Sequence, residues 1–436
     1  MSGDPLAPTD AAQVWEAPVA HAALDATVSI PGSKSLTNRY LVLAALAAEP
    51  VTIRGGLRSR DSELMIAALR ALGVAVDDST EEWRVRPGPL RGGASIDCGL
   101  AGTVMRFVPP LVLLADARVT FDGDQGARVR PMGPLLDALR LLGATVDDDG
   151  RGTLPFAVSP PESLPTEVDV DSSESSQFVT GLLLTAPRLA HGLTIRHIGA
   201  TLPSLPHIDM TCETLRAAGV LVDQPDSRTW VVHPGPLHLG DVRVEPDLSN
   251  AGPFMAAALV AGGTVRIPGW PSATTQPGAL YPELLTRMGA ECRLDADVMT
   301  VTSAGAIRGI DADLSPAGEI TPTIAALCAL ADGPSRLRGI GHLRGHETDR
   351  LAAIAAEVTR LGGECTADAD SLTFGGRPAG GLSGAVMETY HDHRMATFAA
   401  ILGLAVPGIG VRNVGTTAKT MPDFPAMWSG MLGDAA

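Results

Sequence analysis

Hydrophobic and polar positions along the chain follow a pattern that recurs six times. In each copy, a short segment rich in β-branched or apolar residues runs into a turn, which is typical of a strand that ends in a loop. These segments begin at residues 51, 119, 193, 265, 335 and 411, so consecutive copies are about 70 residues apart. We therefore expect the chain to repeat one structural unit.

Two kinds of helix are expected in each unit. The first precedes the strand and is apolar on nearly all sides, which indicates burial on most faces. Its copies are 40–48, 105–115, 177–190, 251–261, 321–331 and 395–404. The second follows the first five loops, is amphipathic and ends at Gly, the residue expected just past a helix. Its copies are 62–72, 135–142, 210–218, 281–288 and 349–361, and β-rich segments such as 145–147 follow them.

These elements predict an α/β protein with two similar domains of three units each. Units of this size are too large for a thin solenoid, and 436 residues suit two domains of ordinary size. The break is expected near 239–247. The strand 26–30, just before Pro31-Gly32, is expected to complete the other half. The predicted domains are 1–31 with 247–436, and 32–246, with residues 1–25 as a loosely held arm.

Composition narrows the functional class. Hydrophobic residues make up 45% and charged residues 19%, as in ordinary globular proteins, and no apolar run is long enough to span a membrane. Five widely spaced cysteines without a C-x-x-C pair argue against a disulfide framework or structural zinc. The first 25 residues do not resemble a secretory signal. With these cysteines, we therefore expect a cytoplasmic protein. A net charge of −16 without a basic stripe argues against a nucleic-acid binder.

Lysine is rare in this chain. Lysine and arginine together number 33, yet Lys34 and Lys419 are the only lysines. Lys is a compact charge that can titrate, whereas Arg is a rigid fork that stays protonated. Either the two lysines are remnants of a compositional bias, or they remain because arginine cannot replace them. Composition alone leaves both readings open.

Dense polar clusters stand at the loops of the units. They are 31–39, 100–106, 127–131, 171–177, 344–350, 391–394 and 416–423. Several lie at predicted helix starts, where backbone N–H groups can bind phosphate or carboxylate. Each cluster alone could be a capped helix, a polar linker or a surface ion pair, and the His391–Arg394 segment is weak evidence for zinc. Together they indicate a site for two multiply charged anions.

Seven motifs in this order resemble the 5-enolpyruvylshikimate-3-phosphate synthase family, from about residue 26 to 424. The motifs are Pro31-Gly-Ser-Lys-Ser35, Leu100-Ala-Gly-Thr103, Arg130-Pro131, Ser175-Ser-Gln177, Glu347-Thr-Asp-Arg350, Asp392-His-Arg394 and Thr417-Ala-Lys-Thr420. The resemblance implies two domains built as inside-out α/β barrels, with the active site in the cleft between them. It also implies transfer of the enolpyruvyl group from phosphoenolpyruvate to shikimate 3-phosphate by addition and elimination, without cofactor or metal.

The resemblance assigns residues to both substrates and to catalysis. Shikimate 3-phosphate would be bound by Lys34, Ser35, Arg39, Ser175, Ser176, Gln177, Ser204, Glu319, His342 and His346. Phosphoenolpyruvate would be bound by Lys34, Gly102, Arg130, Gln177, Arg350, Arg394 and Lys419. The catalytic residues would be Glu319, Glu347, Lys34 and Lys419. Which of Glu319, Glu347 and Lys419 moves each proton is left open.

Several positions depart from the common pattern of the family. Glu319 stands where Asp is usual, which puts its geometry as a base in doubt. His342 and His346 occupy places often held by Asn and Lys. Further departures are His207 for Tyr, Leu100 for Asn and Phe107 for Pro. Gly102 is retained, and we therefore expect inhibition by glyphosate.

Two rival functions are weighed. The related transferase that acts on UDP-N-acetylglucosamine shares the fold but uses a cysteine in the loop that corresponds to 122–130, and no cysteine lies there. A non-catalytic repeat scaffold that binds an acidic partner would not need so many cation-rich turns. Only small-molecule partners are expected, with no nucleic acid or membrane, and the protein is expected to be a monomer.

Overall fold

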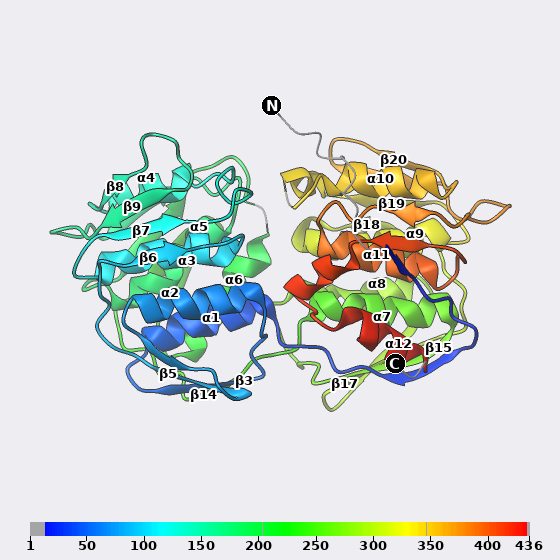
Figure 1. Ribbon diagram of the computed structural model, residues 1–436, viewed down its shortest axis with the longest axis horizontal. Helices are drawn as coiled ribbons and strands as arrows, with labels where there is room; N and C mark the ends of the chain where they lie inside the picture. Colours follow the sequence, from blue (N-terminus) through cyan, green and yellow to red (C-terminus); the bar gives the residue numbers. More distant parts are fainter. Residues whose placement is uncertain (1–13, 203, 346, 434–436) are drawn as a thin grey trace. The chain divides into compact units, whose positions relative to one another are not determined.

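A computed structural model describes residues 14–202, 204–345 and 347–433. The chain forms two compact units (Figure 1). The N-terminal unit is continuous and spans Gly32–Glu245, whereas the C-terminal unit joins the segment before Gly32 to Pro246 and everything after it. The chain passes from one unit to the other at Pro31–Gly32 and at Glu245–Pro246. Because the N-terminal segment belongs to the C-terminal unit, neither unit corresponds to a simple half of the sequence.

The N-terminal unit alternates helices with short strands. Its α-helices are α1 (Lys34–Ala45), α2 (Arg60–Ala71), α3 (Gly102–Leu111), α4 (Gly133–Leu141), α5 (Gln177–Thr185) and α6 (Leu205–Ala217). Its strands are β3 (Val51–Arg54), β4 (Ala75–Asp77), β5 (Glu82–Arg86), β6 (Ser95–Asp97), β7 (Val119–Asp122), β8 (Thr145–Asp147), β9 (Phe156–Ser159), β10 (Glu167–Val170), β11 (Leu193–His197), β12 (Val222–Asp226), β13 (Thr229–Val232) and β14 (Asp241–Arg243).

Three four-stranded sheets of this unit share one topology. Their orders are β14-β3-β5-β4, β6-β7-β9-β8 and β10-β11-β13-β12. In each sheet the first pair is parallel and the other two are antiparallel. A helix connects the parallel strands β6 and β7, and another connects β10 and β11, whereas β14 returns from the end of the unit to pair with β3. The repeated hydrophobic pattern therefore corresponds to a repeated sheet.

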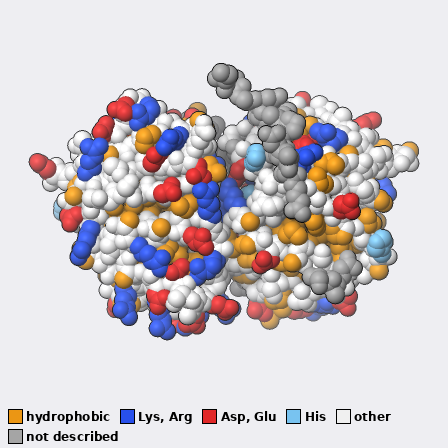
Figure 2. Space-filling view, viewed as in Figure 1, with side chains coloured by type: hydrophobic (Ala, Val, Ile, Leu, Met, Phe, Trp, Pro, Cys, Tyr) orange, Lys and Arg blue, Asp and Glu red, His pale blue; other side chains and the backbone are white. Residues whose placement is uncertain are grey.

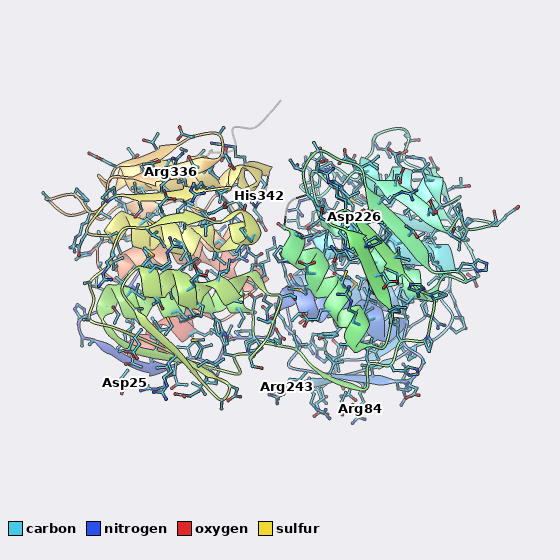
Figure 3. The ribbon with its side chains drawn as sticks, turned by 180° about the vertical axis from the view of Figure 1, so that it is seen from behind. Asp25, Arg84, Asp226, Arg243, Arg336 and His342 are labelled. Atoms are coloured by element: carbon cyan, nitrogen blue, oxygen red, sulfur yellow. The ribbon has the colours of Figure 1, made fainter. Side chains whose placement is uncertain are left out.

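Helices lie inside this unit and sheets outside. Nearly every residue of α3 and α5 is buried, as the apolar segments predicted. Strand β5 alternates instead, with Trp83 and Val85 in the core and Arg84 and Arg86 exposed. Figure 3 shows Arg84 on this outer surface. On the face shown in Figure 2, basic and acidic side chains are intermixed. The arrangement agrees with the inside-out α/β architecture expected from the sequence.

The C-terminal unit repeats the plan. Its α-helices are α7 (Leu248–Ala261), α8 (Tyr281–Arg287), α9 (Thr321–Leu330), α10 (Arg350–Arg360), α11 (His393–Gly403) and α12 (Phe424–Leu432). Its strands are β1 (Val14–Glu16), β2 (Leu24–Thr27), β15 (Gly263–Pro268), β16 (Glu291–Asp295), β17 (Val298–Ser303), β18 (Asp311–Asp313), β19 (Ser335–Arg338), β20 (Cys365–Ala367), β21 (Ser371–Phe374), β22 (Val386–Met387) and β23 (Gly410–Arg412). Short 3₁₀ helices include η4 (Ser315–Ile320), η5 (Gly341–Gly345) and η6 (Val414–Lys419).

Strand β2 pairs in parallel with β15, so the N-terminal segment completes a sheet of the other half, as expected. An arginine on a central strand often joins such parallel pairs. These ion pairs are Arg266–Asp25, Arg54–Asp241, Arg196–Asp169 and Arg338–Asp311, with N–O distances of 2.6 to 2.9 Å. All of these pairs are exposed, so solvent screens their charges and they add little to stability. Their main effect is to favour the observed register of the strands.

The prediction of a loosely held arm is wrong for its described part. Strand β1 pairs antiparallel with β23, and the backbone N–H of Ala17 donates to the Ile409 carbonyl at 2.9 Å. After β23 the described chain continues through η6 and α12 without a hairpin, so this sheet contains only β22 and β23 from the C-terminal region. Strand β1 covers the edge that this leaves, because an unpaired strand edge exposes unsatisfied N–H and carbonyl groups.

Several helices begin earlier than the apolar pattern suggests. The first helix starts at Lys34 rather than at residue 40, and α6 starts at Leu205 rather than at residue 210. The extra turns are mostly polar or partly exposed, so a search for continuous apolar residues misses them. As shown below, these first turns carry the candidate site. No helix among the described residues is long and apolar enough to cross a membrane.

The N-terminal strand should contribute measurably to stability. Trp15 packs edge-to-face against Phe424, with ring centroids 6.1 Å apart. Replacing Trp15 with Ala should destabilise the C-terminal unit by about 2 kcal/mol through lost burial and the lost ring contact. Thermal unfolding should show the midpoint lowered by about 4–8 °C. The exposed Leu294→Ala variant is the control, and an unchanged midpoint in Trp15→Ala would contradict the role given to β1.

Candidate functional site

In the N-terminal unit, predicted site residues stand at the starts of helices. Lys34 begins α1 after the N-cap Ser33, Gly102 begins α3, and Gln177 begins α5. Ser204 is the N-cap of α6 and has a left-handed backbone with φ of 54°. The first turn of a helix leaves N–H groups without intrahelical acceptors, and the helix dipole adds positive potential there. Four such starts offer donors for an anionic ligand.

Lys34 is held by an ion pair that the sequence did not predict. Its Nζ lies 3.4 Å from Oδ2 of Asp61, and the side chains are 19% and 8% exposed. Asp61 lies in the first turn of α2, whose N-cap Ser59 forms a capping box with Ser62. Because Asp61 is fixed by that helix, it restrains the ammonium group of Lys34 while leaving it partly accessible.

Gly102 brings three polar side chains together. A Cβ atom at this position would lie 3.3 Å from Nη1 of Arg106, 3.4 Å from Oε1 of Gln177 and 3.5 Å from Nη1 of Arg130. Arg130 also donates to the Leu100 carbonyl at 3.1 Å. The structure therefore groups Gly102, Arg130 and Gln177, all predicted for phosphoenolpyruvate, and adds Arg106 to them.

Arg106 is the clearest residue that was missed. It is 7% exposed and forms no ion pair with a carboxylate among the described residues. Its Nη atoms contact Met105 Sδ at 3.5 Å and the Pro131 carbonyl at 3.4 Å. Burial, and then the nearby charge of Arg130, lower the pKa of Arg106 to about 9. A buried cation of this kind is costly without an anion, so the group favours a negatively charged ligand.

The serine-rich loop 171–177 is tightly packed. Ser175 Oγ accepts from the Gln177 N–H at 3.3 Å, and Ser176 is 4% exposed. Behind the loop, Nδ1 of His197 accepts from the Ser172 N–H at 3.1 Å. A Cβ at Gly199 would stand 2.0 Å from Oδ1 of Asp171, so only glycine permits this approach. His197 and Gly199 position the loop. The motifs did not identify them because His197 lies 25 residues after Ser172 and Gly199 lies further on in the sequence.

Arg39 has a structural role in addition to the one predicted. It is 2% exposed and donates to Thr211 Oγ1 at 2.8 Å, the His207 carbonyl at 2.7 Å and the Ser35 carbonyl at 2.9 Å. These bonds tie α1 to α6. The guanidinium carbon also lies 5.5 Å from the centre of the Phe107 ring. Contact of Ser35 and Arg39 with a substrate stays a prediction.

In the C-terminal unit, predicted residues form a row of alternating charges. Lys419 Nζ donates to Oε1 of Glu347 at 2.5 Å, and Arg350 Nη2 donates to Oε2 of the same carboxylate at 2.8 Å. Glu347 and Lys419 are 20% and 25% exposed, so both can meet a ligand. The structure thus brings Glu347 and Arg350 into contact with Lys419, which lies 72 positions after Glu347 in the sequence.

Asp392 anchors this row. Arg350 Nε donates to its Oδ2 at 2.7 Å, and both side chains are almost fully buried. Burial alone would lower the pKa of Arg350, but Asp392 and Glu347 outweigh it and hold that pKa above its ordinary value. Asp392 also caps α11 by accepting from the Arg394 N–H at 2.8 Å. It was quoted in the motif but given no role.

Glu319 is held at both carboxylate oxygens. Ser249 Oγ donates to Oε1 at 2.5 Å, and Nη2 of Arg394 lies 3.5 Å from Oε2. Glu319 lies in η4, where Ala317 breaks the helical geometry with φ of −139°. The longer side chain of Glu319 is therefore held by two contacts, and its role as a base stays a prediction.

His342 lies beside the Glu319 loop. A Cβ at Gly318 would stand 2.3 Å from its Nε2, so the ring occupies the space that glycine leaves. Burial lowers the pKa of His342, Asp370 opposes this shift and Arg350 adds to it. Figure 3 labels His342 in η5. His346, which was also predicted for shikimate 3-phosphate, lies outside the described residues.

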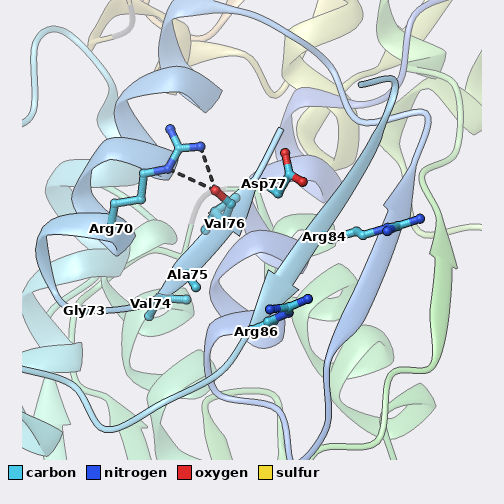
Figure 4. Close-up of a pocket in the computed structure, with 8 residues that line it drawn as sticks. All are labelled: Arg70, Gly73, Val74, Ala75, Val76, Asp77, Arg84 and Arg86. Atoms are coloured by element: carbon cyan, nitrogen blue, oxygen red, sulfur yellow. Dashed lines mark hydrogen bonds between the residues drawn. The ribbon is translucent and has the colours of Figure 1, made fainter. Parts of the chain in front are cut away.

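One groove of the N-terminal unit is unrelated to these residues. It has a volume of about 520 Å³ and lies between α2 and the β4–β5 hairpin (Figure 4). Arg70 donates to the Val76 carbonyl at 2.7 Å there, so a lining cation already serves the backbone. Among the described residues, no three His, Cys, Asp or Glu side chains gather in a way that could hold a metal ion.

Comparisons with known proteins give the family. The family model described as EPSP synthase (3-phosphoshikimate 1-carboxyvinyltransferase) matches residues 19–428. A curated relative from Kocuria rhizophila with the name 3-phosphoshikimate 1-carboxyvinyltransferase is 55% identical, over 96% of this chain and 97% of its own. A relative of the same name from Bifidobacterium longum is 54% identical, over 96% and 98%.

Solved structures show the same fold. An EPSP synthase structure from Acinetobacter baumannii matches with a TM-score of 0.81 and 24% identity, and the match covers 95% of this chain and 97% of that one. A second structure from the same organism gives a TM-score of 0.80. Together with the whole-length sequence matches and the repeated sheets, these findings show that the chain belongs to the EPSP synthase family.

Proposed function

We propose that this protein transfers the enolpyruvyl group of phosphoenolpyruvate to the 5-hydroxyl of shikimate 3-phosphate and releases phosphate, within the biosynthesis of aromatic amino acids. The observation that carries the proposal is the contact of Lys419 with Glu347, which also binds Arg350. It places a proton-carrying pair beside a buried cation, in a family whose relatives bear the name of this reaction.

The reaction needs acid and base groups on both sides of one carbon atom. In the addition step, a base takes the proton of the 5-hydroxyl while its oxygen bonds to C2 of phosphoenolpyruvate, and an acid protonates the methylene carbon. The tetrahedral adduct then loses a methyl proton as the bond from C2 to the phosphate oxygen breaks. General acid–base groups of this kind contribute about 10²- to 10⁴-fold to a rate.

The candidate residues suit these steps. Glu319, held by Ser249 and Arg394, is proposed to take the hydroxyl proton. Glu347 and Lys419 share a short hydrogen bond and are proposed to deliver and remove the methyl proton. Lys34 is proposed to stabilise negative charge on the substrates. Arginines hold phosphate and carboxylate in fixed geometry, which suits Arg130, Arg350 and Arg394.

We propose that the two substrates bind to the following residues. Shikimate 3-phosphate is assigned to Lys34, Ser35, Arg39, Ser175, Ser176, Gln177, Ser204, Glu319, His342 and His346. Phosphoenolpyruvate is assigned to Lys34, Gly102, Arg130, Gln177, Arg350, Arg394 and Lys419. The helix starts of the N-terminal unit and the charged row of the C-terminal unit both suit anionic ligands, which supports the assignment. A monomer in the cytoplasm is proposed as well, and five free cysteines fit a reducing compartment.

The direct test is phosphate release on mixing the protein with phosphoenolpyruvate and shikimate 3-phosphate. UDP-N-acetylglucosamine in place of shikimate 3-phosphate should give no release, because no cysteine lies in the loop 122–130. If the folded protein releases phosphate with neither shikimate 3-phosphate nor UDP-N-acetylglucosamine, the proposal fails. The remaining alternative would be a non-catalytic repeat scaffold.

Both lysines should resist conservative replacement. In Lys34→Arg and Lys419→Arg, the planar guanidinium cannot reproduce the compact ammonium or donate a proton at neutral pH. Steady-state assays should show kcat reduced by about 100-fold or more, with thermal unfolding unchanged. The exposed Arg293→Lys variant serves as control. Near-normal turnover in either lysine variant would mean that the two lysines have no special role.

Glyphosate should inhibit the protein through the Gly102 region. Phosphoenolpyruvate and glyphosate both carry a phosphorus oxyanion and a carboxylate, and Gly102 leaves room against Arg106, Arg130 and Gln177. We expect inhibition well below millimolar concentration. In Gly102→Ala, the Cβ at 3.3–3.5 Å from these three side chains should weaken glyphosate by about 10-fold or more. Full activity of the unmodified protein in millimolar glyphosate would contradict this.

A further inference from the structure

The turn that carries Asp392 has an unusual backbone. Tyr390 and His391, two consecutive residues other than glycine, have φ of 51° and 59°. Left-handed conformations cost such residues roughly 1 kcal/mol or more each, and they persist where surrounding contacts fix them. The turn connects β22 to α11, so it determines where Asp392 and Arg394 lie.

A buried carboxylate holds this turn from α10. The Tyr390 hydroxyl donates to Oε1 of Glu357 at 2.6 Å, and the Glu388 N–H donates to Oε2 at 3.3 Å. Arg360 supplies the opposing charge, with Nε donating to Oε2 at 3.0 Å. Glu357 is fully buried and Tyr390 is 5% exposed. Burial and the charge of Glu357 raise the pKa of Tyr390, so the phenol remains a proton donor.

Helix α10 contacts the turn at two points. Glu357 stands seven residues after Arg350, so both side chains project from one face of α10, about 10 Å apart along its axis. Arg350 binds Asp392 at one end of the turn, and Glu357 binds Tyr390 and the Glu388 backbone at the other. Two contacts fix the orientation of the turn relative to the helix, which a single ion pair would not.

We propose that Tyr390, acting through Glu357, is a positioning residue for phosphoenolpyruvate binding. The pair keeps the strained turn in place, so that Asp392 orients the guanidinium of Arg350 and α11 presents Arg394. In this role Tyr390 and Glu357, which are both buried, act through the turn and not on the substrate itself. The inference rests on the proposed assignment of Arg350 and Arg394 to phosphoenolpyruvate.

The test is Tyr390→Phe, which removes one oxygen atom from a buried side chain. With the hydroxyl gone, the turn loses a contact that opposes its strain, and both arginines lose orientation. The KM for phosphoenolpyruvate should rise about 10-fold, equivalent to about 1.4 kcal/mol. The KM for shikimate 3-phosphate should stay within about twofold, and kcat should fall less than the KM rises.

Ser335→Ala is the matched control. Ser335 Oγ accepts from the Ile310 N–H at 3.1 Å in the same unit, so the variant loses one buried hydrogen bond away from the candidate site. Glu357→Gln is the second variant; it keeps an acceptor for the Tyr390 hydroxyl and should give a smaller rise in the KM for phosphoenolpyruvate. Should Tyr390→Phe fail to fold, the KM for phosphoenolpyruvate of Glu357→Gln is compared with that of Ser335→Ala. Equal KM values in these two variants would then overturn the positioning role.

The outcomes separate the two proposals. An unchanged KM for phosphoenolpyruvate in Tyr390→Phe, or equal rises in both KM values, would overturn the positioning role. Arg394→Lys is measured in parallel. If it raises the KM for phosphoenolpyruvate while Tyr390→Phe does not, only the inference about Tyr390 fails. If Arg394→Lys leaves that KM unchanged, the substrate assignment fails and the inference fails with it.

Discussion

The candidate site of the C-terminal unit depends on one buried ion pair, between Arg350 and Asp392. Removing a guanidinium from water is costly, and a carboxylate at 2.7 Å with further hydrogen bonds offsets that cost. Asp392 also caps α11, so the ion pair links the start of α10 to the start of α11. Glu347 then binds the remaining face of Arg350 and holds Lys419. Displacing Asp392 would therefore disturb three loops together.

The cations of the two units have different surroundings. In the C-terminal unit Arg350, Arg394 and Lys419 each have a carboxylate neighbour. In the N-terminal unit Arg106 has none among the described residues, and Arg130 lies close to it. At Arg106, a ligand phosphate or carboxylate would therefore compete with no carboxylate of the described residues. At Arg350, Arg394 and Lys419, it would have to share the cation with a carboxylate or displace that carboxylate. Preorganised ion pairs cost little reorganisation when charge develops during a reaction.

Much of the fold could be read from the sequence, because each unit repeats the same apolar helix and strand. The apolar pattern by itself places the helix starts too late, since residues such as Lys34 and Leu205 precede the apolar run, although several polar clusters were expected at helix starts. Motifs identified residues with distinctive neighbours, including Gly102 and Arg350. They gave no role to Asp61, Arg106, Ser249 or His197, whose importance comes from contacts with residues distant in sequence. The strand Val14–Glu16 was missed because its partner lies near the other end of the chain.

The pairing of β1 with β23 and of β2 with β15 has a consequence for synthesis on the ribosome. The segment that emerges first contains strands whose partners emerge much later, and β1 must wait until nearly the whole chain has been made. The N-terminal unit needs neither strand, so it can fold while the C-terminal unit is still incomplete. Until then β1 and β2 present unpaired edges, which are open to wrong pairings and to chaperones. The last sheet to close therefore joins the beginning of the chain to its end.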